Sequence, residues 1–283
     1  MAATLTTPPA APARGPAYPD PVLDLPRSAR LAAWGAAVAG RRAALDRAVA
    51  AVQREDEPHT LRWSTTAPAL PGGASATTLR ELLPALPAGS RTEVVLPAPG
   101  DPVGLPGPAD VNAEALDAGE CVVLEVPGAP QRWALVPAVE VFGSAWEPGV
   151  LVEWAVHAAL PRRAPAVVDL PTAERELRTA LTAAVQALAA LDVARWRPDA
   201  ADRIAAVREG GLRPDALPSH HDPRAVRVAQ SAAQVMAIVE LAGQDDGAAV
   251  TGYEVAGRGR ALREVADTAR RALAAAVNAG SAP

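Results

Sequence analysis

The sequence contains no lysine, so all 27 of its basic residues are arginine. Without lysine the protein cannot form a Schiff base with a carbonyl compound, and this excludes pyridoxal-phosphate enzymes and lysine aldolases. A phosphate-binding P-loop also needs a lysine beside its glycines, and no such motif occurs. Composition alone therefore removes these classes of enzyme.

Cysteine, aromatic residues and long apolar runs are scarce as well. The single cysteine, Cys121, cannot form an internal disulfide, and its apolar neighbours predict a buried, inert thiol. Aromatic residues make up 3% of the chain, so alanine, valine and leucine must fill the core, which favours helices. No apolar run approaches the roughly 20 residues that span a bilayer, and the N-terminus lacks the features of a signal peptide. We expect a cytoplasmic protein with no membrane contact.

Three regions of different character follow one another along the chain. Residues 1–27 contain seven prolines and no apolar periodicity, which predicts a flexible, disordered tail. Residues 28–165 mix helix and strand patterns, and residues 166–283 show only helix patterns. The first pattern after Ser28 is an apolar stripe that predicts one amphipathic helix of about 25 residues. The expected fold class is α+β, with an α/β portion followed by an all-helical bundle.

Short apolar segments predict the strands of the α/β portion: 59–64, 92–96, 121–126, 132–136 with an extension to 142, and 150–156. Two short helices are expected among them, one with a capping box at Thr78 and Glu81 and one that begins at Asp110 and ends at Gly119. The last three strands are joined by connections too short for a crossover, and such connections favour antiparallel hairpins. We therefore expect a mixed or antiparallel sheet with flanking helices.

Four amphipathic helices are predicted in the C-terminal portion, the first opened by Pro171. The pair Asp222 and Pro223 is a clear start for the third of them. The loops are short and each helix has an apolar stripe, so the four helices should pack as a small bundle. Gly257 and Gly259 could divide the last one.

The loop from 97 to 108 is dense in proline and glycine and leads into a helix. Asp101, Asp110 and Asn112 could project from it as ligand-binding groups, because ligands often bind where strands end. The alternative is a rigid proline loop in which Asp110 only caps the following helix. The sequence is consistent with both the ligand-binding and the structural interpretation of this loop.

Two residues of the last predicted strand, Glu153 and His157, share a face, so a carboxylate–imidazole pair for general base catalysis is geometrically possible. No nucleophile accompanies them, so a half-exposed polar face is the alternative. His220 and His221 are adjacent in an extended loop, where their side chains point in different directions and no further ligands follow. We therefore predict no metal site and no cofactor.

The stretches 96–107, 112–120 and 133–137 are the most distinctive in the sequence. Together with the rest of the chain from Ser28 onward, they resemble a family of conserved proteins of high-GC actinobacteria to which no function is assigned. The resemblance implies an actinobacterial origin and a family that covers the chain. It implies no activity, cofactor or site residue.

Three functions follow from these observations. The missing catalytic motifs and the apolar stripes of the helical portion favour a non-enzymatic interaction or regulatory protein, with a protein partner or self-association. An enzyme or small-ligand-binding protein, with its site between the two portions, is the first alternative. The second is a nucleic-acid-associated protein that uses the arginine pairs at 41–42, 162–163 and 270–271, although the net charge of −5 argues against it.

Overall fold

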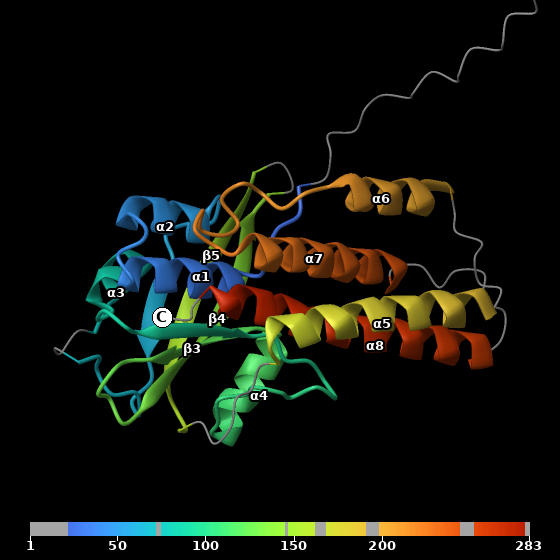
Figure 1. The fold of residues 1–283 in the computed structure, drawn as a ribbon. Coiled ribbons are helices and arrows are strands. Elements are labelled where there is room, and N and C mark those ends of the chain that lie inside the picture. The colour runs from blue at the N-terminus through green and yellow to red at the C-terminus, as the bar shows by residue number, and fades with distance from the viewer. Residues whose placement is uncertain are drawn as a thin grey trace, which may run out of the picture.

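The computed structural model describes residues 22–71, 75–144, 147–161, 168–190, 198–243 and 252–280. The described helices are α1 (Arg27–Ala39), α2 (Leu45–Gln53), α3 (Leu79–Ala85), α4 (Ala109–Ala118), α5 (Leu170–Ala190), α6 (Pro198–Glu209), α7 (Pro223–Gly243) and α8 (Gly252–Ala279). The strands are β1 (Thr60–Trp63), β2 (Arg91–Val95), β3 (Cys121–Glu125), β4 (Arg132–Gly143) and β5 (Pro148–Ala159). The chain is α+β, and its C-terminal part is helical, as the sequence predicts (Figure 1).

The strands form one mixed sheet in the order β1-β5-β4-β3-β2. β3, β4 and β5 follow one another as antiparallel hairpins, which confirms the prediction from their short connections. β2 pairs antiparallel with β3. β1 instead pairs parallel with β5, with Thr60 beside Glu153, because the long chain between them allows the return that a parallel pair needs. β1 and β2 are thus the edge strands.

Helices cover both faces of the sheet (Figure 1). α1 lies on one face, where Val122, Trp133 and Leu135 of the sheet join the main core. α4 lies on the opposite face, and its Val111 and Ala115 pack on smaller apolar groups there. Since neighbouring residues of a strand point to opposite faces, the central strands are apolar on both.

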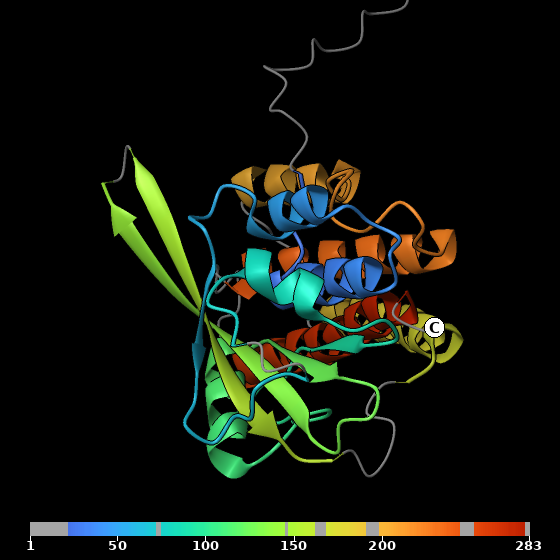
Figure 2. The same ribbon diagram turned by 90° about the vertical axis from the view of Figure 1, so that its left-hand side faces the viewer.

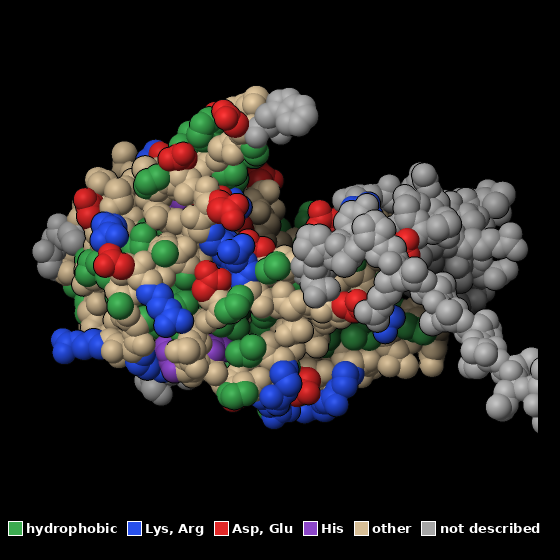
Figure 3. All heavy atoms as spheres, turned by 90° about the horizontal axis from the view of Figure 1, so that it is seen from above, with side chains coloured by type: hydrophobic (Ala, Val, Ile, Leu, Met, Phe, Trp, Pro, Cys, Tyr) green, Lys and Arg blue, Asp and Glu red, His purple; other side chains and the backbone are tan. Residues whose placement is uncertain are grey.

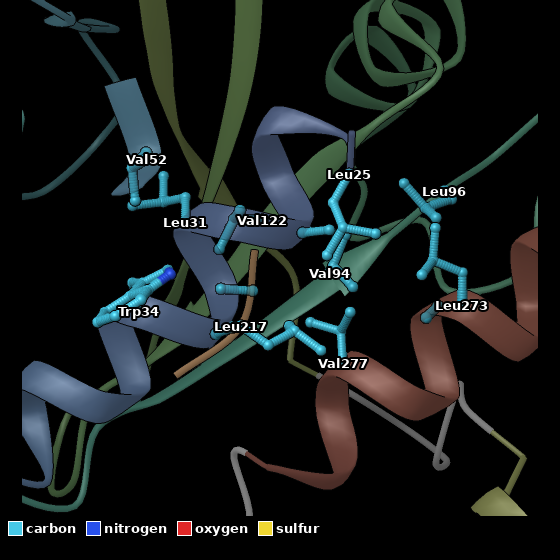
Figure 4. Close-up of a cluster of buried hydrophobic side chains, with 14 of the residues drawn as sticks. Leu25, Leu31, Trp34, Val52, Val94, Leu96, Val122, Leu217, Leu273 and Val277 are labelled. Atoms are coloured by element: carbon cyan, nitrogen blue, oxygen red, sulfur yellow. The ribbon is translucent and has the colours of Figure 1, made fainter. Parts of the chain in front are cut away.

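The helical part packs directly on the sheet portion and shares its core. α8 contacts α5, α7, α1 and the edge strand β2. Leu217, Leu273 and Val277 lie in the same cluster as Val94 of β2 (Figure 4). The Asn278 amide completes this contact: its Oδ1 accepts a hydrogen bond from the Val94 N–H at 2.8 Å, and its Nδ2 donates one to the Val94 carbonyl at 3.1 Å. The Asn278 amide thus pairs with the backbone of the edge strand β2 at Val94, as a residue of a neighbouring strand would.

The predicted tail is wrong for its last residues. Leu23 and Leu25 are buried in the core, and Leu23 forms an isolated bridge with Leu212. Burial of these two large apolar side chains offsets the conformational entropy that the segment loses on becoming ordered. The proline-rich composition alone did not predict this burial. We call residues 22–26 the N-terminal strap; residues 1–21 lie outside the described part of the chain.

The single long helix predicted after Ser28 is two helices. A straight helix of that length would extend roughly 37 Å. The chain instead turns after α1: Gly40 follows it, and Arg41 has a left-handed φ of 55°. The second apolar stripe then packs on the first as α2, with Val49 and Val52 buried.

Some helix ends are as predicted and others are not. Asp222 caps α7, because its Oδ1 accepts a hydrogen bond from the Arg224 N–H at 2.6 Å. Gly119 ends α4 with a left-handed φ of 71°. Thr78 is the N-cap residue of α3, as predicted, but its side chain makes no cap hydrogen bond. The N-cap residue of α4 is Pro108, so the predicted cap at Asp110 is wrong. α8 runs through its glycines without a division.

β4 and β5 extend beyond the rest of the sheet as a projecting pair (Figure 2). We call residues 137–143 and 148–152 the hairpin arm. β3 pairs with β4 only as far as Leu135, and no other described strand pairs with that edge of the arm. The arm carries large exposed apolar side chains: Val139, Val141, Phe142 and Leu151.

α7 is the one described helix that is long and apolar enough, by length and composition, to cross a membrane. The helix contains Arg224, Arg227 and Glu240, so it is not an uninterrupted apolar run. Seven of its residues, all alanine or valine, are buried, and the helix packs against α8. A core helix has the same composition, because it too is surrounded by apolar neighbours.

Candidate ligand-binding site

The structure gives two of the predicted loop residues structural partners. Oδ2 of Asp101 lies 2.7 Å from Nη1 of Arg271 on α8. Oδ1 of Asn112 accepts a hydrogen bond from the Gly107 N–H at 2.7 Å. Asp110 is exposed in the first turn of α4. Asp101 borders a cavity of about 30 Å³, which has room for little more than one water molecule. Asp101 and Asn112 therefore hold the loop in place.

Glu153 and His157 lie on one face of β5, but each has a different partner. Nε of Arg62 donates a hydrogen bond to Glu153 Oε1 at 2.6 Å. Nε2 of His157 lies 3.0 Å from Oε2 of Glu114 on α4. The two candidates are therefore drawn to separate charged neighbours, one on β1 and one on α4.

The remaining candidate groups are buried or isolated. Nε2 of His221 lies 3.0 Å from the Ala276 carbonyl oxygen, whereas His220 is exposed. Burial raises the pKa of Cys121 to about 12, so the thiol stays protonated, as predicted. Within the described ranges, no three His, Cys, Asp or Glu side chains are grouped so that they could hold a metal ion.

The arginine pairs do not form one basic surface. Arg270 and Arg271 each pair with an aspartate. Arg41 and Arg42 are exposed after α1, and residues 162–163 lie outside the described part of the chain. Acidic and basic side chains are interspersed on the face that Figure 3 shows. A duplex backbone favours a continuous positive field instead.

A cleft of about 660 Å³ lies between the two parts of the chain; we call it the interlayer cleft. Its walls are the N-terminal strap, the start of α1, the end of α2, the turn end of the hairpin arm (Pro148 and Val150), Arg213, α7 and Leu273 of α8. Small-molecule sites have volumes of roughly 300–1,000 Å³. A second cleft of about 660 Å³ lies between α5 and α8, but its Arg175 and Glu176 are exposed. The interlayer cleft holds buried charges, and it is the better candidate site.

Asp56, which follows α2, is the centre of a hydrogen-bonded group in the cleft wall. Arg27 donates two hydrogen bonds to its carboxylate, from Nε at 2.7 Å and from Nη2 at 2.8 Å. His59 Nε2 lies 3.1 Å from Oδ2, and Trp154 Nε1 donates to His59 Nδ1 at 3.2 Å. Because an indole N–H only donates, Nδ1 is the acceptor and Nε2 carries the proton.

The same contacts set the charges of this group. Burial lowers the pKa of His59 to about 4, although Asp56 favours the charged imidazole. Burial also opposes ionisation of Asp56, but the hydrogen bonds from Arg27 and His59 outweigh it and lower the pKa of the carboxyl. A neutral imidazole, a carboxylate and a guanidinium therefore satisfy one another. They add no net charge to the cleft.

Two further arginines in the wall are less well satisfied. Nη1 of Arg30 donates to both carboxylate oxygens of Asp24, at 3.0 and 2.9 Å. Nη1 of Arg54 lies 2.5 Å from Oδ1 of the same carboxylate, yet none of its guanidinium nitrogens makes a hydrogen bond to a described group. The side chains of Arg30 and Arg54 are 4% and 6% exposed, and that of Asp24 is 53% exposed. Burial lowers the pKa of Arg54.

Glu120, just before β3, joins the cleft to the start of α1. Its Oε2 accepts a hydrogen bond from the Ser28 backbone N–H at 2.7 Å. This satisfies one of the N–H groups that a helix leaves unpaired in its first turn. Burial raises the pKa of Glu120, and the hydrogen bond from Ser28 opposes the shift.

None of the charged groups of this cleft is among the predicted site residues. They come from the strap, from the ends of α1 and α2, from α7 and from the connections that hold Glu120 and Arg213, so no local motif marks them. One signal was present in the sequence: Arg30 lies three residues after Arg27 and beside Leu31, within the apolar stripe of the helix. A charge on the buried side of a helix needs a partner, and this need points to a cluster.

Fold and cleft together define an α+β protein with a charged site between a sheet portion and a helical part. Residues 28–170 match the family model described as Rv1486c-like protein, N-terminal domain, and residues 171–274 match Rv1486c-like protein, C-terminal domain. The chain therefore belongs to the Rv1486c-like family, which agrees with the resemblance in its sequence. No curated protein and no solved structure matches the chain.

Proposed function

We propose that this protein binds a small molecule in the interlayer cleft and acts as a non-enzymatic regulatory protein. The observation that carries the proposal is that both parts of the chain line one cleft of about 660 Å³. Charged groups line it from the strap, α1 and α2, while Met236 and Ala237 of α7 add an apolar wall. A ligand in this position contacts both parts, so binding would affect how they pack. The buried, unpaired thiol of Cys121 supports a cytoplasmic location.

Met236 offers a direct reporter of binding in this cleft. The chain has two methionines, so protein labelled with ¹³C at the methionine methyl groups gives a simple spectrum. The variant Met236→Leu assigns the signal from the cleft. We expect a set of small fragments to include members that shift the Met236 signal in a saturable way.

A bulky side chain in the cleft should block these fragments. Ala237 is half-buried and lines the cleft, so Ala237→Trp should weaken their binding by at least about tenfold. Ser231 is exposed on the same helix and is not among the residues lining the cleft, so Ser231→Trp is the matched control and should leave binding unchanged. Circular dichroism and the midpoint of thermal unfolding establish that both variants fold. The proposal fails if no fragment shifts the Met236 signal, or if folded Ala237→Trp binds as the parent does.

A second function, self-association, is favoured by the hairpin arm. The open edge of β4 from Ala138 to Gly143 is exposed and, apart from Glu140, apolar, and an open edge pairs readily with another strand. Two copies can pair antiparallel about a two-fold axis. With Val141 on the axis, Glu140 lies opposite Phe142 of the second copy, so this register avoids like charges.

This register makes a specific prediction. Val141→Asp would place two carboxylates opposite each other on the axis, and it should convert a dimer to a monomer in sedimentation velocity experiments. Val185→Asp on α5 is the matched control, because Val185 is 67% exposed and Val141 is 70% exposed. A monomeric parent protein, or equal dissociation by both variants, would remove this second function.

A further inference from the structure

Arg54 is the least satisfied charged group of the cleft. Its side chain is 6% exposed, and its three guanidinium nitrogens are buried without a hydrogen bond to any described group. Its backbone is also unfavourable, with φ at 55° and ψ at −119° for a residue that is not glycine. A buried guanidinium that donates no hydrogen bond is costly, and such costs recur at sites where a ligand supplies the missing partner.

The other charges around Arg54 balance one another. Arg27 and Asp56 form a pair with Nε and Oδ2 2.7 Å apart. Arg213 and Asp215 form a looser pair with Nε and Oδ1 3.6 Å apart. His59 beside Asp56 is neutral at pH 7, as its lowered pKa requires. Glu55, Glu120 and Glu240 also line the cleft, but among the described residues the carboxylate that forms an ion pair with Arg54 is that of Asp24.

Arg30 and Arg54 are left to share Asp24. Both buried cations thus have their shortest ion pair with one carboxylate, since Nη2 of Arg30 lies 3.9 Å from Oδ2 of Asp56, and the Asp24 carboxylate is more than half exposed on the N-terminal strap. Oδ1 of Asp24 contacts both guanidinium groups, as one oxygen of a bound anion would. The Asp24 carboxylate occupies the position of an anionic ligand group, and it is attached to a segment that is not part of a helix or of the sheet.

We infer that the interlayer cleft recognises the anionic group of an amphiphilic small molecule, a carboxylate or a phosphate, through Arg54 and Arg30. This inference rests on the proposed function, since it names the class of ligand for the same cleft. Met236, Ala233 and Val150 also line the cleft, and they offer an apolar surface to the body of the ligand. The anionic group exchanges with Asp24 for the two guanidinium groups, so Asp24 competes with the ligand.

Four probes with one chain length test the inference in the full protein: hexanoate, hexyl phosphate, hexanol and hexylamine. Titrations followed by the Met236 methyl signal give a dissociation constant for each. We expect at least one of the two anions to bind about tenfold or more tightly than hexanol, and hexylamine to bind no better than hexanol. The comparison of hexanoate with hexyl phosphate shows which anion the arginines prefer.

Two substitutions test the recognition of the anionic group independently of the stability of the fold. Arg54→Met keeps a long side chain and removes a buried charge, so the variant should remain folded with an equal or higher melting temperature. It should lose the preference for anions and keep the affinity for hexanol. Asp24→Asn removes the competing carboxylate and should raise the affinity for anions by about tenfold. Arg80→Met, at an exposed arginine that is not among the residues lining the cleft, is the control and should change nothing.

The possible outcomes distinguish failure of the anion inference from failure of the proposed binding of a small molecule in the interlayer cleft. If fragments shift the Met236 signal but hexanol or hexylamine binds as tightly as either anion, the anion inference is overturned and the proposed function stands. The same holds if folded Arg54→Met keeps the preference, or if Asp24→Asn weakens anion binding. If neither the fragments nor the four probes shift the Met236 signal, the anion inference and the proposed function are both rejected.

Discussion

Trp34→Ala should lower the free energy of unfolding by about 4 kcal/mol, the typical cost of removing a large aromatic side chain from a core. Trp34 on α1 is 1% exposed, and its Nε1 donates a hydrogen bond to the Asp215 carbonyl at 3.1 Å. It therefore links the sheet portion to the segment before α7. Urea unfolding followed by both circular dichroism and tryptophan fluorescence measures the loss.

The same experiment asks whether the two parts unfold together. Because one core includes residues of both (Figure 4), we expect a single transition that moves to lower urea by both probes. Trp34→Phe is the matched control: it keeps most of the apolar volume, loses the hydrogen bond and should cost only about 1–2 kcal/mol. Two separate transitions, of which Trp34→Ala shifts one, would contradict a shared core.

Acidification should destabilise the protein through His59. The pKa of this imidazole is about 4 in the folded protein, below its ordinary value of 6.5, so between these values the unfolded chain binds a proton that the folded protein does not. Stability is therefore full above pH 6.5 and falls as the pH drops toward 4. The shift corresponds to a loss of about 3 kcal/mol. Unfolding free energies measured across this range give the slope.

A pair of variants isolates this contribution, since burial also lowers the pKa of His221. His59→Gln preserves an N–H donor for Asp56 and removes the titration, so its stability should depend less on pH, by up to about 1.4 kcal/mol per pH unit. His220 is exposed, but partial burial, Arg42 and His221 also lower its pKa, so His220→Gln should reduce the parental slope less than His59→Gln does. Equal slopes in the parent and in His59→Gln would show that His59 is not the group responsible.

The fold could be predicted from the sequence wherever the signal is local. The apolar run that starts at Cys121 predicts β3 because a strand covered on both faces has no polar alternation. Gly119 predicts the end of α4 because glycine accepts a left-handed φ. The pair Asp222 and Pro223 predicts the start of α7, since one side chain caps and the other fits the first turn.

The candidate site could not be predicted because its signals are not local. Asp24 reads as part of a proline-rich tail until Leu23 and Leu25 are seen to be buried. Arg27 and Asp56 are 29 positions apart, and only the turn between α1 and α2 brings them together. The predicted candidates also have partners that are distant in the sequence: Asp101 pairs with Arg271, which comes 170 positions later in the chain. Which partner a charged side chain takes is decided by tertiary packing.

The amide of Asn278 has a consequence for biosynthesis. It reaches Val94 from 184 positions further along the chain, so at least that many more residues must be synthesised before this backbone contact can form. Until then the nascent sheet presents unpaired backbone groups, which can template aggregation.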